Sequence, residues 1–156
     1  MFGTTVLERP AIMEIRLLDS TDAALLQHVA EGVFDHPIDP RWSTEFFADP
    51  RHHLAVAIDD GQVVGMASGV HYVHPDKPPE LWVNEVGVAP THQGRGLGRR
   101  ILTALLERGA ALGCSEAWVL TSPENAAARR MYAASGGVET RREVLITFHL
   151  ARDKHR

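Results

Sequence analysis

Hydrophobic and polar residues follow two different periods along this chain, one typical of strands and one typical of helices. Strands are predicted where apolar residues alternate or run together, at residues 12–18, 53–58, 62–71, 81–88, 117–121 and 143–150, with a shorter strand at 138–141. Helices are predicted where apolar residues recur every three or four positions: from a Ser20 or Thr21 cap onward, at 41–47, from the glycines before residue 99 to Gly113, and at 123–135. The order β-α-α-β-β-β-α-β-α-β predicts an α+β fold, a mixed sheet with helices packed on it.

Two glycines in this pattern predict local structure, one at a turn and one inside a helix. Asp59-Asp60-Gly61 separates two strand-like runs and predicts a hairpin turn. Gly109 falls on the apolar face of the long helix, where close packing against the sheet is the expected reason for a residue that destabilises helices.

Length and composition narrow the class of protein. With 156 residues, 44% of them hydrophobic and 23% charged, the chain is expected to form one domain over residues 1–156. No apolar run approaches a membrane span and the first residues lack the features of a secretory signal, so we expect a cytoplasmic protein that does not bind membranes. The single cysteine, Cys114, excludes an internal disulfide and is expected to be a packing residue.

Charge is distributed unevenly along the sequence. Residues 1–90 hold 5 Lys and Arg against 14 Asp and Glu, whereas residues 91–156 hold 11 against 6, within a net charge of −4. This split suggests that the two halves face ligands of opposite sign. Nucleic acid is not an expected partner, because the whole chain is acidic and the basic half has no interleaved aromatic residues.

A glycine-rich stretch, HQGRGLGRR at residues 92–100, lies between a predicted strand and a predicted helix. A dinucleotide fingerprint starting at Gly94 would need glycine where Arg99 stands, and a P-loop would need Gly-Lys followed by Ser or Thr. Both are therefore excluded. A glycine-rich loop at a helix N-terminus still favours an anion, because backbone N–H groups and the helix dipole point at it and small residues permit close approach.

Two spaced motifs carry a resemblance to a known family. The pattern Gln93-x-x-Gly96-x-Gly98 resembles the pyrophosphate-binding signature of the GNAT N-acetyltransferases, which hold acetyl-coenzyme A (acetyl-CoA). The pattern Asn125-x-x-Ala128-x-x-x-Tyr132, along one helix face, is similar to the second motif of that superfamily. The resemblance spans residues 56–148 and implies the GNAT fold, a mixed and mostly antiparallel sheet splayed between its fourth and fifth strands.

The resemblance also implies roles for individual residues. A β-bulge in strand 81–88 would free the backbone of Val86, Gly87 and Val88 to pair with the pantetheine arm, and an N–H there would polarise the thioester carbonyl. Backbone N–H groups would bind the diphosphate, with arginine side chains available for its charge; the expected ligands are Gln93, Gly94, Arg95, Gly96, Leu97, Gly98 and Arg99, and Arg100 is also within reach. Tyr132 would protonate the coenzyme A sulfur. Asn125 would order the pantetheine or a water, or else cap its helix.

The general base is predicted on the strand that precedes the glycines. On simple alternation Glu85 shares a face with Leu81 and Val83, an apolar setting that suits a base, although a bulge would change this parity. The stretch 85–88 also looks like the acidic strand of aminoglycoside 3-N-acetyltransferase-like members, where the acid faces the acceptor amine. His71 and His74 are alternative bases acting through water, but as i, i+3 on a strand they do not form a metal pair, and no metal is expected.

These features predict an acetyl-CoA-dependent N-acetyltransferase acting by direct attack in a ternary complex, as a monomer or homodimer. Acidic residues in the region that supplies the acceptor wall in this superfamily favour a small cationic amine such as an aminoglycoside-like sugar or a polyamine; they are Glu31, Asp35, Asp39 and Glu45. Two alternatives remain open: a catalytically silent acyl-CoA-binding module, and an acetyltransferase for a protein or peptide amine. The acceptor and the length of the acyl chain are not determined by the sequence.

Overall fold

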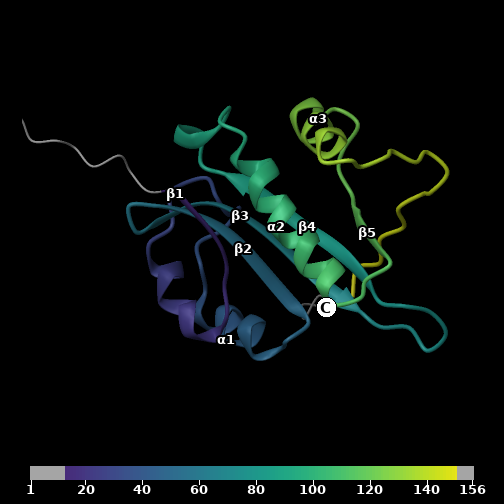
Figure 1. Cartoon of the computed structure of the whole chain (residues 1–156), viewed down its shortest axis with the longest axis horizontal. Helices are drawn as coiled ribbons and strands as arrows, with labels where there is room; N and C mark the ends of the chain where they lie inside the picture. The colour runs from purple at the N-terminus through teal and green to yellow at the C-terminus, as the bar shows by residue number, and fades with distance from the viewer. Residues whose placement is uncertain (1–12, 151–156) are drawn as a thin grey trace, which may run out of the picture.

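The computed structural model describes residues 13–150, and within them one mixed sheet has the strand order β1-β2-β3-β4-β5. Its strands are β1 (Met13–Leu17), β2 (His52–Asp59), β3 (Gln62–Tyr72), β4 (Glu80–Val88) and β5 (Glu116–Val119). The helices are α1 (Pro40–Ala48), α2 (Leu97–Ala111) and α3 (Ala126–Ala134), with 3-10 helices η1 (Ser20–Gln27) and η2 (Pro90–His92) (Figure 1). Neighbouring strands from β1 to β4 are antiparallel, and β5 is parallel to β4, so the predicted α+β architecture is confirmed.

Helix α2 lies across one face of the sheet and buries its apolar side there (Figure 1). Ile101 and Leu105 are fully buried in this interface. A Cβ at Gly109 would lie 2.8 Å from Cδ2 of Leu81 on β4, so the predicted reason for a glycine inside the helix is confirmed. None of the helices within residues 13–150 is long and apolar enough to cross a membrane.

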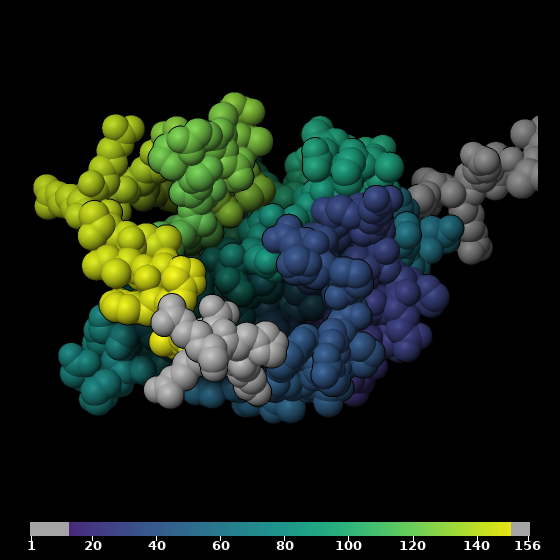
Figure 2. Space-filling model, turned by 180° about the vertical axis from the view of Figure 1, so that it is seen from behind, coloured from purple at the N-terminus to yellow at the C-terminus, as the bar shows by residue number. Residues whose placement is uncertain are grey.

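The opposite face of the sheet is covered only in part. The segment that includes η1 and α1 packs on it, with Leu26 and Val33 buried in the common hydrophobic cluster. Seen from this side, the surface is hollowed between the purple and blue N-terminal segment and the green and yellow C-terminal part (Figure 2). Teal atoms from the middle of the chain are visible inside this hollow (Figure 2).

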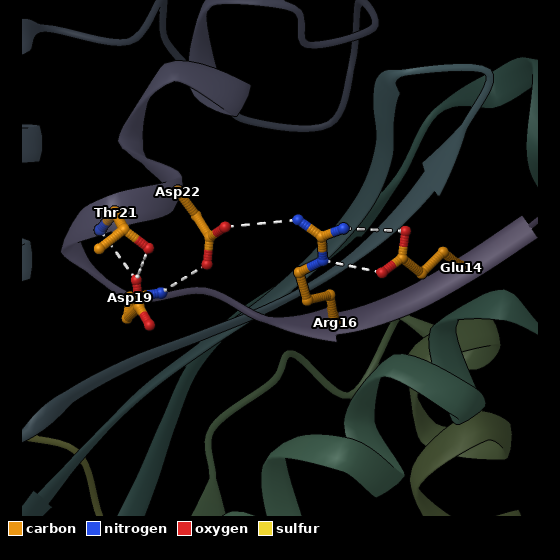
Figure 3. Close-up of polar contacts among 5 residues, drawn as sticks. All are labelled: Glu14, Arg16, Asp19, Thr21 and Asp22. Carbon is orange, nitrogen blue, oxygen red and sulfur yellow. Dashed lines mark hydrogen bonds and ion pairs between the residues drawn. The ribbon is translucent and has the colours of Figure 1, made fainter.

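Helix η1 differs in type and start from the predicted α-helix capped by Ser20 or Thr21. Asp19 is its N-cap: the Asp19 carboxylate accepts hydrogen bonds from the backbone N–H of Thr21 at 2.8 Å and from its hydroxyl at 2.5 Å, while Asp22 accepts from the Asp19 N–H at 3.1 Å (Figure 3). This reciprocal pair is a capping box with aspartate at both ends. Arg16 links the box to β1, because it donates to Asp22 and to Glu14.

Three local predictions at turns and element ends have different outcomes. The hairpin at Asp60–Gly61 is confirmed, and both residues adopt left-handed φ angles of +48° and +75°. Cys114 is partly buried against the core, as predicted for a packing residue, and burial raises the pKa of its thiol. The last helix begins at Ala126 rather than at Pro123, because the Asn125 side chain caps it.

The prediction of two C-terminal strands at 138–141 and 143–150 is wrong. These residues have no regular secondary structure, and their apolar side chains are exposed, among them Leu145 at 74% and Phe148 at 78%. A strand is stabilised by pairing with a neighbour, and an alternating sequence does not by itself provide one. Within the described residues the outer edge of β5 is therefore also the edge of the sheet.

Candidate functional site

The fourth strand carries a bulge in its middle. Ser68 on β3 pairs with Glu85, and the next residue, Gly69, pairs with Val83, so Asn84 is an extra residue on β4. One extra residue reverses the alternation of side chains between the two faces of a sheet. The Cβ direction of Gly69 points at Leu105 of α2, which places Val83 on the α2 face and Glu85 on the opposite face.

The predicted apolar setting of Glu85 is therefore wrong. Leu81 and Val83 are buried, but Glu85 is exposed on the other side of the sheet. Gly87 shares the face of Glu85, and a Cβ at Gly87 would overlap the backbone carbonyl of Val33, which belongs to the segment between η1 and α1. Glu85 thus lies exposed on the face opposite α2 rather than within the core.

Strands β4 and β5 separate halfway along β4. The pairing joins residues 80–83 to residues 116–119 and stops there, although β4 continues to Val88. Residues 86–88 remain hydrogen-bonded to β3, and within the described chain no strand pairs with their other edge. The sheet is splayed as predicted, and the backbone of Val86, Gly87 and Val88 faces the gap.

Residues 93–98, called here the glycine loop, follow η2 and include the first two residues of α2. Gly94 and Gly96 have φ angles of +76° and +72°, which non-glycine residues rarely adopt, and no atom lies within 4 Å of a Cβ placed at either position. Gly96 is the N-cap of α2 and has no side chain to cap it, so the first N–H groups of the helix are directed at the open space. The Gln93 side chain donates to the carbonyl of Val88 at 3.0 Å, which ties the loop to the end of β4.

The side chains around the glycine loop are positively charged. Arg95, Arg99 and Arg100 are all exposed, and none of them forms an ion pair with another residue of the 13–150 segment. Together with the N-terminus of α2, these charges make an electropositive surface suited to an anion.

Helix α3 approaches the glycine loop closely. A Cβ at Gly98 would lie 2.7 Å from the sulfur of Met131, so a larger residue there would have to displace the Met131 side chain where the two helices meet. Asn125 begins α3, and its side-chain oxygen accepts a hydrogen bond from the N–H of Ala128 at 3.1 Å. Of the two roles considered for Asn125, helix capping is the one that this geometry shows.

Tyr132 lies one turn after Ala128 in α3 and borders a cavity of about 220 Å³ between α2, α3 and the splayed strands. Val83 and Val119, the last paired residues of β4 and β5, border the same cavity. Burial raises the pKa of the Tyr132 phenol above its ordinary value of 10.0, so the hydroxyl stays protonated at neutral pH. No side-chain hydrogen bond engages this hydroxyl within the described residues, which leaves it available as a proton donor.

A larger cavity of about 710 Å³ lies between η1, the following loop and α1. Glu31 and Asp35 are the two carboxylates among its lining residues. The other acidic residues of this region are placed differently, because Asp39 caps α1 and binds Arg41 at 2.8 Å, and Glu45 does not line the cavity. Gly32 and Phe34 line this cavity, and the backbone carbonyl of Val33 between them packs on Gly87.

The two histidines considered as bases are engaged elsewhere. His71 Nδ1 lies 2.7 Å from Nε2 of His53 on the α2 face of the sheet, and burial together with the neighbouring His71 lowers the pKa of His53 to about 4. His74 Nε2 lies 2.6 Å from a carboxylate oxygen of Glu80. Among residues 13–150 there is also no group of three or more His, Cys, Asp or Glu that could hold a metal ion.

Comparison with known proteins agrees with this geometry. The sequence matches the acetyltransferase (GNAT) family over residues 14–136. It is 32% identical over 139 residues to an aminoglycoside N(6′)-acetyltransferase type 1 of Salmonella enteritidis, covering 85% of this chain and 96% of that protein. It is 39% identical over 79 residues to an L-2,4-diaminobutyric acid acetyltransferase of Nocardia farcinica, covering 51% of this chain but only 40% of the relative.

A solved structure shows the same fold. The aminoglycoside N-acetyltransferase AAC(6′)-Iy in complex with CoA superposes with a TM-score of 0.72 and 24% identity, covering 92% of this chain and 99% of that one. The aminoglycoside-modifying relatives are of the N(6′) type, whereas the motif around Glu85 resembled loosely the 3-N type. The family match covers most of the sequence, and the splayed sheet, the glycine loop and α3 all lie inside it. The chain belongs to the GNAT acetyltransferase family.

Proposed function

We propose that this chain transfers an acetyl group from acetyl-CoA to a primary amine of a small cationic acceptor. The observation that carries the proposal is the unpaired edge of β4 leading directly into a glycine loop at the N-terminus of α2. Acetyl-CoA joins an extended pantetheine chain to a diphosphate. The extended chain matches the unpaired strand edge, and the diphosphate matches the N–H groups at the start of the helix.

The donor occupies the gap between β4 and α3 in this proposal. The diphosphate binds the backbone N–H groups of the glycine loop, with Arg95 and Arg99 supplying positive charge. The pantetheine arm pairs with residues 86–88 like an added strand. A backbone N–H at this edge donates to the thioester carbonyl and stabilises the oxyanion that develops there.

The acceptor approaches from the face on which Glu85 lies. Its neutral amine nitrogen attacks the thioester carbon, a C–N bond forms, and collapse of the tetrahedral intermediate breaks the C–S bond. Tyr132 donates its proton to the departing sulfur, and Glu85, directly or through water, accepts the proton that the amine loses. The bulge at Asn84 supports this arrangement, because it turns Glu85 away from the α2 face while Tyr132 lies in the gap between β4 and α3.

Charge favours a cationic acceptor. Glu31 and Asp35 line the cavity beside Gly87, and Glu85 adds a third carboxylate on the same side of the sheet. Aminoglycosides and L-2,4-diaminobutyric acid, for which two relatives are named, are small molecules with amino groups. Because this chain spans only 40% of the diaminobutyrate enzyme, we propose the class of acceptor and not one compound.

A thiol-release assay with acetyl-CoA over a panel of amines tests this function. The panel contains aminoglycosides, polyamines, diamino acids and a peptide with a free N-terminus. We expect turnover with at least one small cationic amine. Acetyl-CoA binding without turnover on any amine would identify a silent binding module, and turnover on the peptide alone would assign a protein acceptor; either result would refute the proposal.

Replacing Glu85 by glutamine is expected to lower kcat/KM for the amine by about 100-fold near neutral pH while leaving acetyl-CoA affinity unchanged, because the substitution removes a base and keeps the shape. Glu116→Gln is the matched control, since Glu116 is exposed on the adjacent strand beyond the splayed part of the sheet. Steady-state kinetics at varied amine concentration measure kcat/KM for both variants. Equal kinetics for the Glu85→Gln variant and the wild type would remove Glu85 from the mechanism.

A further inference from the structure

Residues 93–96 of the glycine loop make few packing contacts. Residues 93–96 are exposed, and two of them are glycines with open space on every side of the Cβ position. A loop of this kind loses conformational entropy when a ligand orders it, and that loss weakens binding unless neighbouring structure holds the loop in place beforehand. The residues on either side of the loop therefore influence its affinity for a ligand.

The C-terminal side of the loop is anchored by packing. Leu97, the first residue of α2, is 3% exposed and belongs to the hydrophobic core. Gly98 packs against Met131 of α3. These contacts fix the start of the helix but do not reach the residues that precede Gly94.

Besides the bond from Gln93 to Val88, the N-terminal side is anchored by a hydrogen bond to a distant part of the chain. His92, the last residue of η2, places Nε2 at 2.7 Å from Oδ2 of Asp59, the last residue of β2. Because an ionised carboxylate only accepts hydrogen bonds, Nε2 carries the hydrogen. The Asp59 backbone is held in register between Met13 and Gln62, so the hydrogen bond connects the loop to the hairpin of β2 and β3.

Further contacts make this anchor specific. Nδ1 of His92 lies 2.8 Å from the Thr91 hydroxyl, and the His92 N–H donates to the carbonyl of Ala89, so both ring orientation and backbone are constrained. The side chains of His92 and Asp59 are only 15% and 21% exposed. Oδ1 of Asp59 is buried and has no partner among the described residues, which makes the His92 ring the one polar partner of this carboxylate there.

We infer that Asp59 and His92 are positioning residues, and that the hydrogen bond between their side chains holds the glycine loop in the conformation that binds the diphosphate of the acyl donor. Neither side chain is required to touch the donor or the acceptor. The inference rests on the proposed coenzyme A site and adds a second element, the β2–β3 hairpin, to the structure that determines donor affinity. Loss of this hydrogen bond leaves the thioester and the amine undisturbed and loosens only the site of the diphosphate.

The test compares acetyl-CoA with S-acetylpantetheine, a donor that has the thioester and pantetheine but no diphosphate. For Asp59→Ala we expect the KM and Kd for acetyl-CoA to rise by about tenfold, with kcat unchanged, because a charge-assisted hydrogen bond is lost. kcat/KM for S-acetylpantetheine is expected to equal that of the wild type. A general loss of stability would lower kcat/KM for both donors together. An effect on acetyl-CoA alone therefore separates a positioning role from a folding role.

Matched variants sharpen the comparison. Asp60→Asn removes the same charge one residue away, in a side chain without a hydrogen-bond partner within residues 13–150, and asparagine tolerates the left-handed φ of that turn; it is expected to behave as the wild type. His92→Ala is expected to reproduce the loss, and the double variant Asp59→Ala/His92→Ala to add nothing to it. His92→Gln, which keeps an N–H donor near Nε2, is expected to restore part of the affinity.

Two results would overturn the inference in different ways. If Asp59→Ala lowers kcat/KM equally for both donors, or for neither, the hydrogen bond between Asp59 and His92 does not position the loop. If the wild type itself uses S-acetylpantetheine as well as acetyl-CoA, no diphosphate site exists at the glycine loop, and the donor site under the proposed function fails together with the inference.

Discussion

Acetyl-CoA is expected to bind about 100-fold more weakly after Gly96→Asp, because a carboxylate would stand among the N–H groups that bind the diphosphate. Gly96 is the N-cap of α2, and its Cβ position points into open space, so the new side chain meets the ligand rather than the protein. Aspartate also places a negative charge at the positive end of the helix dipole, which stabilises the free helix and leaves repulsion of the ligand as the main effect. Isothermal titration with acetyl-CoA measures the change.

The matched control for this change is Gly96→Asn. Asparagine has nearly the same shape as aspartate and tolerates the φ of +72° about as well, but it carries no charge. We expect the asparagine variant to bind within about tenfold of the wild type, and the difference between the two variants to shrink as salt screens the repulsion. Equal affinities for the two variants would show that backbone strain, not a bound anion, dominates at this position, and would remove the diphosphate assignment.

Elements whose cause is local could be predicted from the sequence. The Asp60–Gly61 hairpin and the glycine loop follow from the conformational freedom of glycine, and the packing role of Gly109 follows from its lack of a side chain. The start of α3 was predicted three residues early because Ser122-Pro123 is also a good initiation signal, and only the hydrogen bond from Ala128 to Asn125 shows which one is used.

Features that depend on pairing between distant segments could not be predicted. The face on which Glu85 lies is set by the register of β4 against β3, since the bulge at Asn84 appears only when Ser68 and Gly69 are aligned with it. Residues 143–150 alternate as a strand would, but alternation specifies a face and not a partner. The hydrogen bond between His92 and Asp59 joins residues 33 positions apart, and no spacing rule indicates such a contact.

Tyr132→Phe is expected to lower kcat by about 100-fold while acetyl-CoA affinity stays within about twofold, since the change removes one hydroxyl and general acids contribute factors of this size. Tyr132 borders the cavity between the splayed strands and α3, where the ring keeps its packing in the phenylalanine variant. The other tyrosine of the chain is the control. Tyr72 accepts a hydrogen bond from Trp118 at 2.6 Å and lies outside that cavity, so Tyr72→Phe is expected to leave kcat unchanged.

The pH dependence of kcat separates an acid from a packing residue at position 132. Burial raises the pKa of the Tyr132 phenol above 10.0, so the wild type holds the proton through the neutral range and loses it, and with it turnover, only as pH rises past that raised pKa. In Tyr132→Phe we expect kcat to be low at every pH and to show no such alkaline decline. Rapid-quench or steady-state measurement of kcat between neutral and strongly alkaline pH gives both curves. If Tyr132→Phe instead weakens acetyl-CoA binding and keeps the wild-type kcat and its alkaline decline, Tyr132 packs against the donor and another group protonates the sulfur.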